Sequence, residues 1–316
     1  MKIKAPTMKK NKPKRSIISW IKRYWLRMIV LLFISAIIGF ALIVEFALPH
    51  WPIRPWHRTS NVKPSDYGLR DEPFDLEVDS GLILRGYLIE ATTKAKATIV
   101  YLHGIGGFKE SNIPFAKTLT SEGYNVLIYD QRAHGKSGGT FCTFGENEKK
   151  DLSKMLDSLL KRLPNVPIGI HGSSMGGAVA LQCLEFDERI KFGIVESTFN
   201  TLENVVVEYG RDYFKFRSRW IARRVLSKSA VIANFNPFAI NPVESCKNIE
   251  QPMLIVHGDK DENIPIEFNR ENFEALKSTD KEFYTVHGAT HFNVGEVGGE
   301  AYKKKLLDFL NRQTRL

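Results

Sequence analysis

Cysteine is scarce in this chain: only three occur among 316 residues, at Cys142, Cys183 and Cys246. They lie far apart, are odd in number, and form neither a Cys-x-x-Cys pair nor a His/Cys cluster. This pattern argues against a disulfide scaffold and a zinc site, so we expect no metal. The run Gly104-x-Gly106-Gly107 lacks the third glycine and the later acid of a dinucleotide site, so we also expect no cofactor.

Acidic residues are absent from residues 1–27, which carry ten lysines and arginines. The rest of the chain carries 35 basic and 35 acidic residues, so the whole formal excess of +10 precedes residue 28. A domain that binds nucleic acid normally has a basic excess of its own. We therefore predict no nucleic-acid partner for the catalytic part of this chain.

Charge is also scarce between Met28 and Leu48, a 21-residue apolar run whose one charged residue is Glu45. A helix of about 20 apolar residues crosses a bilayer core, so we expect a single membrane anchor. The basic residues before it predict a cytosolic N-terminus and a folded domain on the extracytoplasmic side. The alternative is a cleaved signal peptide, but its apolar region is shorter and Phe46–His50 is a poor cleavage site.

The most informative motif is Gly172-Ser173-Ser174-Met175-Gly176, which stands between an apolar strand-like run and a helix-like run. A strand, Gly-x-Ser-x-Gly and a helix in this order are typical of a nucleophile elbow, which presents Ser174 to a substrate. The alternative is an ordinary strand-to-helix turn, because glycine and serine are common in turns.

Three other segments favour the catalytic interpretation. A glycine-rich loop after the strand-like run 97–102 predicts an oxyanion hole made by the N–H groups of Ile105 and Met175. The acidic loop after 252–256 supplies Asp261 as the predicted triad acid, with Asp259 as its main competitor and Glu262 also in that loop. The loop after 281–286 supplies His291 as the predicted base, in preference to His287. Serine, acid and histidine then follow in the chain order of one fold.

Together these motifs resemble the α/β-hydrolase superfamily over roughly Phe74 to Leu310. The run Asp130-Gln131-Arg132-Ala133-His134-Gly135-Lys136-Ser137 is similar to a further motif of that family, with Ala133 where glycine is usual. We expect Asp130, Arg132 and His134 to tie loops together without a catalytic role. The resemblance is strongest to membrane-associated hydrolases of acyl esters, thioesters or acylglycerols, although serine-aminopeptidase-like and lysophospholipase-like members share the motifs.

The predicted architecture is α/β, with a mostly parallel sheet, helices on both faces and a small helical cap, preceded by one transmembrane helix. We divide the chain into a basic tail (1–27), an anchor (28–48), a semi-extended proline-rich linker (49–73) and a hydrolase domain (74–316) with a cap insertion (199–242). We expect aromatic cap residues to line an acyl pocket and cap arginines to meet anionic headgroups. The predicted elements are a hairpin over 74–91, strands at 97–102, 125–129, 167–171, 191–195, 252–256 and 281–286, and helices at 113–121, 147–163, 176–186, 267–277 and 299–312.

The expected function is hydrolysis of an acyl ester or thioester of a lipid-like substrate by Ser174, His291 and Asp261, at a membrane and without a cofactor. Two alternatives use the same three residues: an acyltransferase that excludes water, and a peptidase. A third alternative is a non-catalytic, membrane-tethered binding domain, because a fold does not by itself imply a function.

Overall fold

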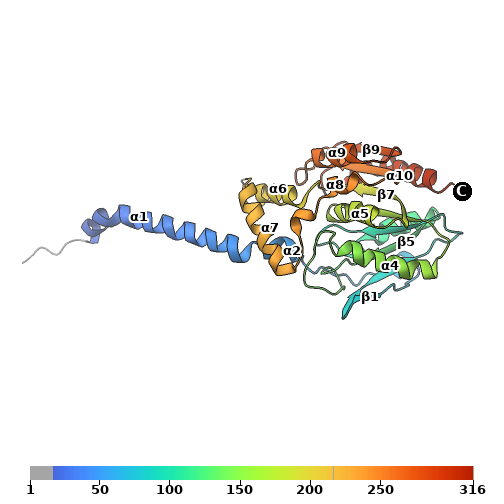
Figure 1. Ribbon diagram of the computed structural model, residues 1–316, viewed down its shortest axis with the longest axis horizontal. Coiled ribbons are helices and arrows are strands. Elements are labelled where there is room, and N and C mark those ends of the chain that lie inside the picture. The colour runs from blue at the N-terminus through green and yellow to red at the C-terminus, as the bar shows by residue number, and fades with distance from the viewer. Residues whose placement is uncertain (1–16, 216, 316) are drawn as a thin grey trace, which may run out of the picture.

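The computed structural model describes residues 17–215 and 217–315, so residues 1–16 of the predicted basic tail lie outside the described chain. A long helix α1 (Ile17–Leu42) continues through a π-helical turn, η1 (Ile43–Ala47), and projects away from the rest of the molecule (Figure 1). The stretch from Trp20 to Ile53 is long and apolar enough to cross a membrane, and an 18-residue window within it has a mean hydropathy of 2.8. The predicted anchor over 28–48 lies within this stretch, and most of its residues are exposed.

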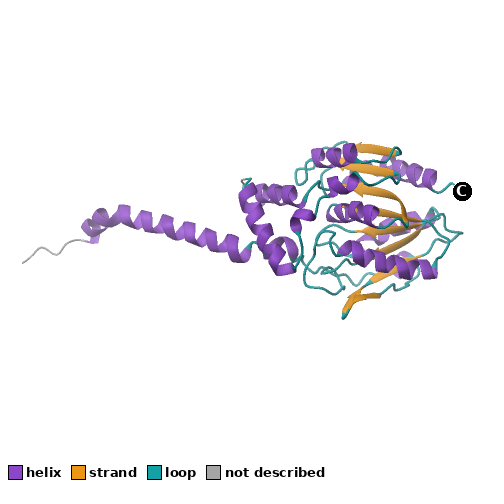
Figure 2. Ribbon diagram, viewed as in Figure 1, coloured by secondary structure: helices purple, strands orange, loops and turns teal. Residues whose placement is uncertain are grey.

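The body is built on a seven-stranded sheet, seen in Figure 2 with helices on both sides. Its strand order is β3-β5-β4-β6-β7-β8-β9, and every pair is parallel except β3 with β5. Buried apolar runs form the central strands, as expected when helices cover both faces. The strands are β3 (Gly86–Ile89), β4 (Thr98–Leu102), β5 (Asn125–Tyr129), β6 (Ile168–Ser173), β7 (Ile190–Glu196), β8 (Met253–Gly258) and β9 (Lys281–Val286).

The N-terminal hairpin differs from the prediction. Its turn lies at Ser80 and Gly81, as expected, and joins β1 (Leu76–Asp79) to β2 (Leu82–Leu84) in a separate two-stranded sheet. The chain then leaves the hairpin, and β3 pairs with β5 of the main sheet. The expected hairpin over 74–91 is therefore too long, because residues 86–89 pair with β5 of the main sheet, where three of the four are buried.

Helices cover both faces of the main sheet. On one face, α4 (Glu148–Arg162), α5 (Met175–Phe186), α8 (Pro242–Cys246) and α9 (Ile266–Ala275) enclose an apolar core. On the other face, α3 (Ile113–Ser121), which follows the short 3-10 turn η3 (Lys109–Asn112), and α10 (Val294–Gln313) enclose a second core. The predicted helix over 299–312 forms, and a backbone break at Gly299 separates it from an additional first turn.

The insertion between β7 and α8 is helical, as predicted. It contains α6 (Leu202–Phe214), α7 (Arg219–Ala233) and the 3-10 turn η4 (Pro237–Ala239). Thr201 and Ser218 cap the two longer helices, because each side-chain oxygen accepts a hydrogen bond from a free N–H of the first turn. The insertion packs on the body through a third apolar cluster that includes Met175, the residue after the predicted nucleophile.

The segment that follows the membrane-spanning candidate departs from the expected semi-extended linker. Residues His50–Ile53 form one helical turn, α2, and Ile53 is completely buried in the apolar cluster under the insertion. The backbone N–H of Cys142 donates to the carbonyl of Ile53 (2.9 Å), which fixes the segment to the body. Its prolines therefore shape a packed segment, and a short 3-10 turn, η2 (Pro64–Tyr67), follows further on.

Candidate active site

Ser174 stands at the sharp turn between β6 and α5, at the carboxyl end of the central strands. Its backbone is held at φ +55°, a conformation that is strained for any residue with a side chain. The neighbouring glycines are required by close backbone approach, because a Cβ at Gly172 would lie 2.2 Å from the Gly176 oxygen. A Cβ at Gly176 would lie 2.0 Å from the Leu102 oxygen. The motif therefore forms the strand–turn–helix that the sequence predicts.

His291 joins the other two predicted catalytic side chains. Its Nε2 lies 3.0 Å from the Ser174 hydroxyl, and its Nδ1 lies 2.7 Å from Oδ2 of Asp261. The loops after β8 and β9 bring the acid and the histidine to the carboxyl edge of the sheet, where Ser174 also lies. The His291 side chain is 7% exposed and that of Asp261 is fully buried, so the hydrogen-bonded chain is largely shielded from water.

Asp261 is held as a carboxylate by its surroundings. Burial raises its pKa, but hydrogen bonds from His257 and His291 and from the N–H of Ile264 outweigh burial and keep the pKa below its ordinary value. An ionised Asp261 accepts the Nδ1–H of His291, which leaves Nε2 as the acceptor for the Ser174 proton. This is the tautomer that a general base requires.

The two acids of the β8 loop meet different histidines. Asp259 accepts a hydrogen bond from Nδ1 of His287 (2.9 Å) and from the N–H of Gly288 (2.7 Å). The His287 side chain is 85% exposed, so this pair lies at the surface. Asp261, by contrast, contacts His291, and the geometry therefore separates the preferred acid from its competitor.

His257 is a component of the site that the sequence prediction missed. It is completely buried at the end of β8, with Nε2 3.0 Å from the Ile264 carbonyl and 3.3 Å from Oδ2 of Asp261. The side-chain amide of Asn269 donates to its Nδ1 (3.0 Å), so Nε2 carries the proton. His257 thus supports Asp261 from behind. Its one sequence signal is a histidine within an otherwise apolar strand, four residues before the acid.

The glycine-rich loop after β4 approaches Ser174 closely. A Cβ at Gly104 would lie 3.2 Å from the Cβ of Ser174 and 3.8 Å from its hydroxyl oxygen. The N–H of Met175 lies in the first turn of α5, where backbone donors have no intrahelical acceptor. Within the described chain, neither Met175 nor Ile105 donates its N–H to a protein acceptor. Both donors are therefore available to a substrate oxygen.

His103 fixes the start of this loop. Its Nδ1 lies 2.8 Å from the Gly104 carbonyl, and its Nε2 accepts the N–H of Gln131 (3.1 Å). Burial lowers the pKa of His103 to about 4, so the ring is neutral near pH 7 and donates through Nδ1–H. The Gln131 amide also donates to the His103 carbonyl (2.7 Å). The sequence predicts no role for this histidine, although it directly precedes the glycine-rich run.

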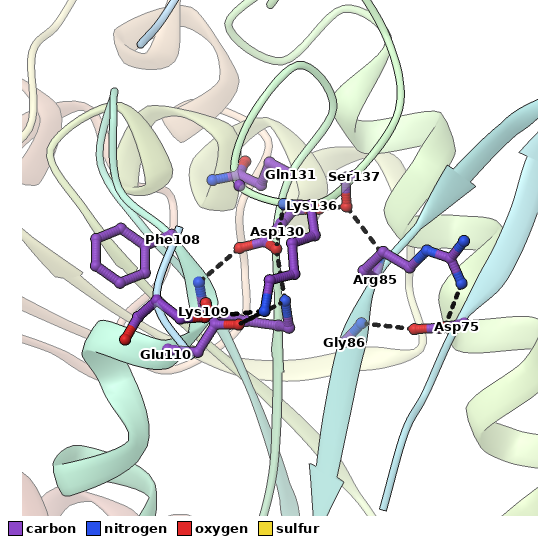
Figure 3. Close-up of polar contacts among 12 residues, drawn as sticks. Asp75, Arg85, Gly86, Phe108, Lys109, Glu110, Asp130, Gln131, Lys136 and Ser137 are labelled. Carbon is purple, nitrogen blue, oxygen red and sulfur yellow. Dashed lines mark hydrogen bonds and ion pairs between the residues drawn. The ribbon is translucent and has the colours of Figure 1, made fainter. Parts of the chain in front are cut away.

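Asp130 ties the far end of the loop to the body, as Figure 3 shows. Its carboxylate accepts the N–H of Lys109 (2.6 Å), the Lys109 ammonium (2.7 Å) and the N–H of Lys136 (2.9 Å). Lys109 also pairs with Glu110 (3.0 Å), and all three charged groups are buried. Asp130 therefore has the loop-tying contacts that the sequence predicts.

The rest of that motif also joins loops. Arg132 forms a two-pronged ion pair with Asp151 of α4, at 2.7 and 2.6 Å. His134 is buried and its Nδ1 lies 2.9 Å from the Arg132 carbonyl. Ala133 stands between them at φ +59°, in the left-handed region that favours glycine. The departure from the family motif thus places strain in the loop backbone.

A cavity of about 540 Å³ opens over Ser174 and His291. Its wall is mostly apolar, and one side is formed by Leu202, Val205 and Tyr209 of α6. Among the described residues, no aspartate, glutamate or lysine lines it, and its arginines are Arg54 and Arg58. Such a cavity suits an apolar acyl group better than a cationic one.

The predicted roles of the insertion are borne out only in part by these contacts. Of its aromatic residues, Tyr209 and Tyr213 line the cavity, and Phe199 and Phe235 are buried. Three others, Phe214, Trp220 and Phe238, are exposed, and Phe216 lies outside the described residues.

The predicted contact of the cap arginines with lipid headgroups stays a prediction, and the structure adds the partners of these arginines within the protein. Each has an acidic side chain within ion-pair distance: Arg211 and Arg217 pair with Glu208, Arg219 and Arg223 with Glu203, and Arg224 with Glu45. These carboxylates neutralise part of the positive charge of the cap arginines.

Comparisons with known proteins find relatives of similar sequence and fold. A family model described as serine aminopeptidase, S33, matches residues 93–237. The structure of the Pyrococcus furiosus esterase Pf2001 superposes with a TM-score of 0.70 at 27% identity, covering 82% of this chain and 97% of that one. The protein YqkD of Bacillus subtilis is 28% identical over 80% of this chain and 79% of its own length. A lysophosphatidylserine lipase, ABHD12 of Macaca fascicularis, is 27% identical over 57% of this chain and 46% of its own length.

Proposed function

We infer that this chain, an α/β-hydrolase of the serine-hydrolase type, is a membrane-anchored enzyme that cleaves acyl esters with Ser174, His291 and Asp261. The observation that carries the proposal is the continuous hydrogen-bonded chain from the serine through the histidine to the buried acid. Its supports are the cavity above Ser174 and the N–H groups of Ile105 and Met175, which have no protein acceptor in the described part of the chain.

In the proposed reaction, the Ser174 oxygen attacks the acyl carbonyl while His291 Nε2 takes its proton. The carbonyl electron pair moves to the oxygen, which the N–H groups of Ile105 and Met175 stabilise. When the tetrahedral adduct collapses, the bond to the leaving alcohol breaks and His291 returns the proton to that alcohol. Water, deprotonated by His291, then attacks the acyl-enzyme. The bond between the acyl carbon and the Ser174 oxygen breaks, the acid leaves, and His291 returns the proton to Ser174. Asp261 stabilises the imidazolium in both steps.

The cavity favours an ester over an N-terminal peptide as the substrate. An aminopeptidase has to receive the α-ammonium group of its substrate, and burying that charge without a carboxylate partner is costly. No aspartate or glutamate lines the cavity in the part of the chain that the structure describes. The matching family model is named after an aminopeptidase, but the residues that line the cavity favour acyl esters as substrates.

We assign residues 28–48 as the anchor, 74–316 as the hydrolase domain and 199–242 as its cap, with the basic tail 1–27 on the cytosolic side. Glu45, near the end of the apolar stretch, forms ion pairs with Arg224 and Lys228 of α7. Figure 1 shows α6 and α7 between this helix end and the body. This arrangement would place the cap next to the bilayer surface and the cavity behind it.

The test is hydrolysis of p-nitrophenyl butyrate by the full-length protein in a non-ionic detergent. We expect S174A to lower kcat by at least about 10³-fold and D261N by a similar factor, because triad members act as a unit. D259N, which alters a surface pair, should leave kcat within about threefold of the wild-type value. Equal activity of wild type and S174A would contradict the proposal, and a larger loss in D259N than in D261N would reassign the acid.

A further inference from the structure

The segment that follows the membrane helix, residues 49–58, is built into the cap and is here called the juxtamembrane segment. The Trp51 ring packs edge-on against Tyr209 and Tyr213 of α6, with centroids 5.7 and 4.8 Å apart. The Ser229 hydroxyl of α7 donates to the Pro49 carbonyl (2.7 Å). With Ile53 completely buried, these contacts hold the segment in one position relative to the cavity.

The juxtamembrane segment forms one wall of the cavity above Ser174. Its lining residues are Trp51, Pro52, Arg54, Pro55, Trp56 and Arg58. The segment that joins the anchor to the enzyme therefore also contacts whatever occupies the cavity. Substrate selection and membrane attachment would then share the same residues.

This wall supplies the cavity's positive charge. The guanidinium of Arg54 lies over the Phe141 ring at 5.1 Å, and that of Arg58 over the Trp56 ring at 5.7 Å. Stacking engages the flat faces of the guanidinium groups and leaves the N–H edges available. No carboxylate lies within ion-pair distance of either group in the described part of the chain, unlike the paired arginines of the cap.

We propose that Arg54 and Arg58 form an anion subsite, and that the substrate is an amphiphile carrying both an acyl ester and a phosphate or carboxylate. The acyl chain would lie against the apolar wall from α6, with the anion at the juxtamembrane wall. Among the described residues, no aspartate or glutamate lines the cavity, so no carboxylate there would attract a cationic substrate. The proposal rests on the proposed function, because it assigns the ester to Ser174.

The first test compares two substrates with the same ester, 1-oleoylglycerol 3-phosphate and 1-oleoylglycerol, in non-ionic detergent. We expect wild type to prefer the phosphate by about tenfold or more in kcat/KM, the range of a charge-assisted contact. The R54Q/R58Q variant should lose this preference through KM. R270Q is the matched control, because Arg270 is exposed and stacks on Phe283 away from the cavity.

A soluble pair separates substrate binding from attraction to a lipid surface. We expect 4-butyryloxybenzoate to be preferred to 4-butyryloxybenzamide by wild type and R270Q but not by R54Q/R58Q. If the double variant keeps either preference, or wild type shows none, the proposal is overturned. It is also overturned if the arginines matter only when anionic lipid is added to the micelles, because they would then bind the membrane surface.

Calorimetric titration with hexyl phosphate separates failure of the subsite from failure of the proposed function. We expect binding to wild type and S174A, and binding at least about tenfold weaker in R54Q/R58Q. Binding without hydrolysis would retain the subsite and reject the ester hydrolase. Hydrolysis of neutral esters without hexyl phosphate binding would reject the subsite and retain the hydrolase.

Discussion

Ala133 shows how a single side chain is strained by the loop it occupies. It adopts φ +59° between Arg132 and His134, which are both held by hydrogen bonds. A left-handed conformation costs a residue with a Cβ roughly 1–2 kcal/mol, more than the extra chain entropy that glycine loses on folding.

We therefore expect A133G to raise the free energy of unfolding by about 0.5–1 kcal/mol, measured by urea denaturation. A230G in the interior of α7 is the control, and should lower the free energy of unfolding by about 1 kcal/mol. A loss of stability in A133G would show that the alanine methyl group contributes packing that outweighs the strain.

The sequence predicts residues with distinctive local patterns better than residues defined by their partners. Ser174 stands in a motif whose glycines are forced by contacts within the turn itself, so spacing alone locates it. The pairing of Asp261 with His291, and of Asp259 with His287, depends on how two loops meet. His257 carries no motif, because its role arises from burial beside Asp261.

At the scale of elements, the loops after β4 and β5 each carry a buried histidine. Burial lowers the pKa of His103 to about 4. Burial, together with the nearby His103 ring, lowers the pKa of His134 to about 3. The unfolded chain binds protons at the ordinary histidine pKa of 6.5, while the folded chain does not. Stability is therefore fully present above that pH and falls as the pH decreases towards the folded-state values.

For each buried histidine, we expect the free energy of unfolding to fall by up to about 1.4 kcal/mol for every pH unit below the ordinary histidine pKa. The measurement is chemical denaturation between pH 7 and about pH 4, followed by near-ultraviolet circular dichroism. H134Q should reduce the slope, and H287Q, which alters an exposed histidine, should not. An unchanged slope in H134Q would show that His134 does not stay neutral in the folded protein.

Strands and helices of the body follow from apolar runs and turn signals, and their predicted bounds agree closely with β4 to β9. The prolines of the juxtamembrane segment predict an extended chain. Its helical turn and burial depend on α6, α7 and the loop around Cys142, which are far away in sequence. Likewise, the ion pairs of the cap arginines depend on the angle between α6 and α7, which no local pattern fixes.

For the whole molecule, the charge distribution predicts an orientation in the membrane. All three cysteines are free and buried, so a membrane-impermeant maleimide has little to react with in the native chain. We expect E188C, at an exposed position, to be labelled in intact cells without permeabilisation, because the positive-inside pattern places the hydrolase outside. The wild-type chain, which lacks the added cysteine, gives the background labelling. Labelling that requires permeabilisation would reverse the proposed topology.

The central claim is that the buried hydrogen bonds to His291 and Asp261 activate Ser174 as a nucleophile. Its most direct test is covalent labelling of the full-length protein, in detergent, with a fluorophosphonate, followed by peptide mapping of the adduct by mass spectrometry. We expect one adduct, on Ser174, that is absent from S174A and present in S121A, which alters an exposed serine at the end of α3. A folded wild-type protein that takes no label, or takes it at another residue, would contradict the account.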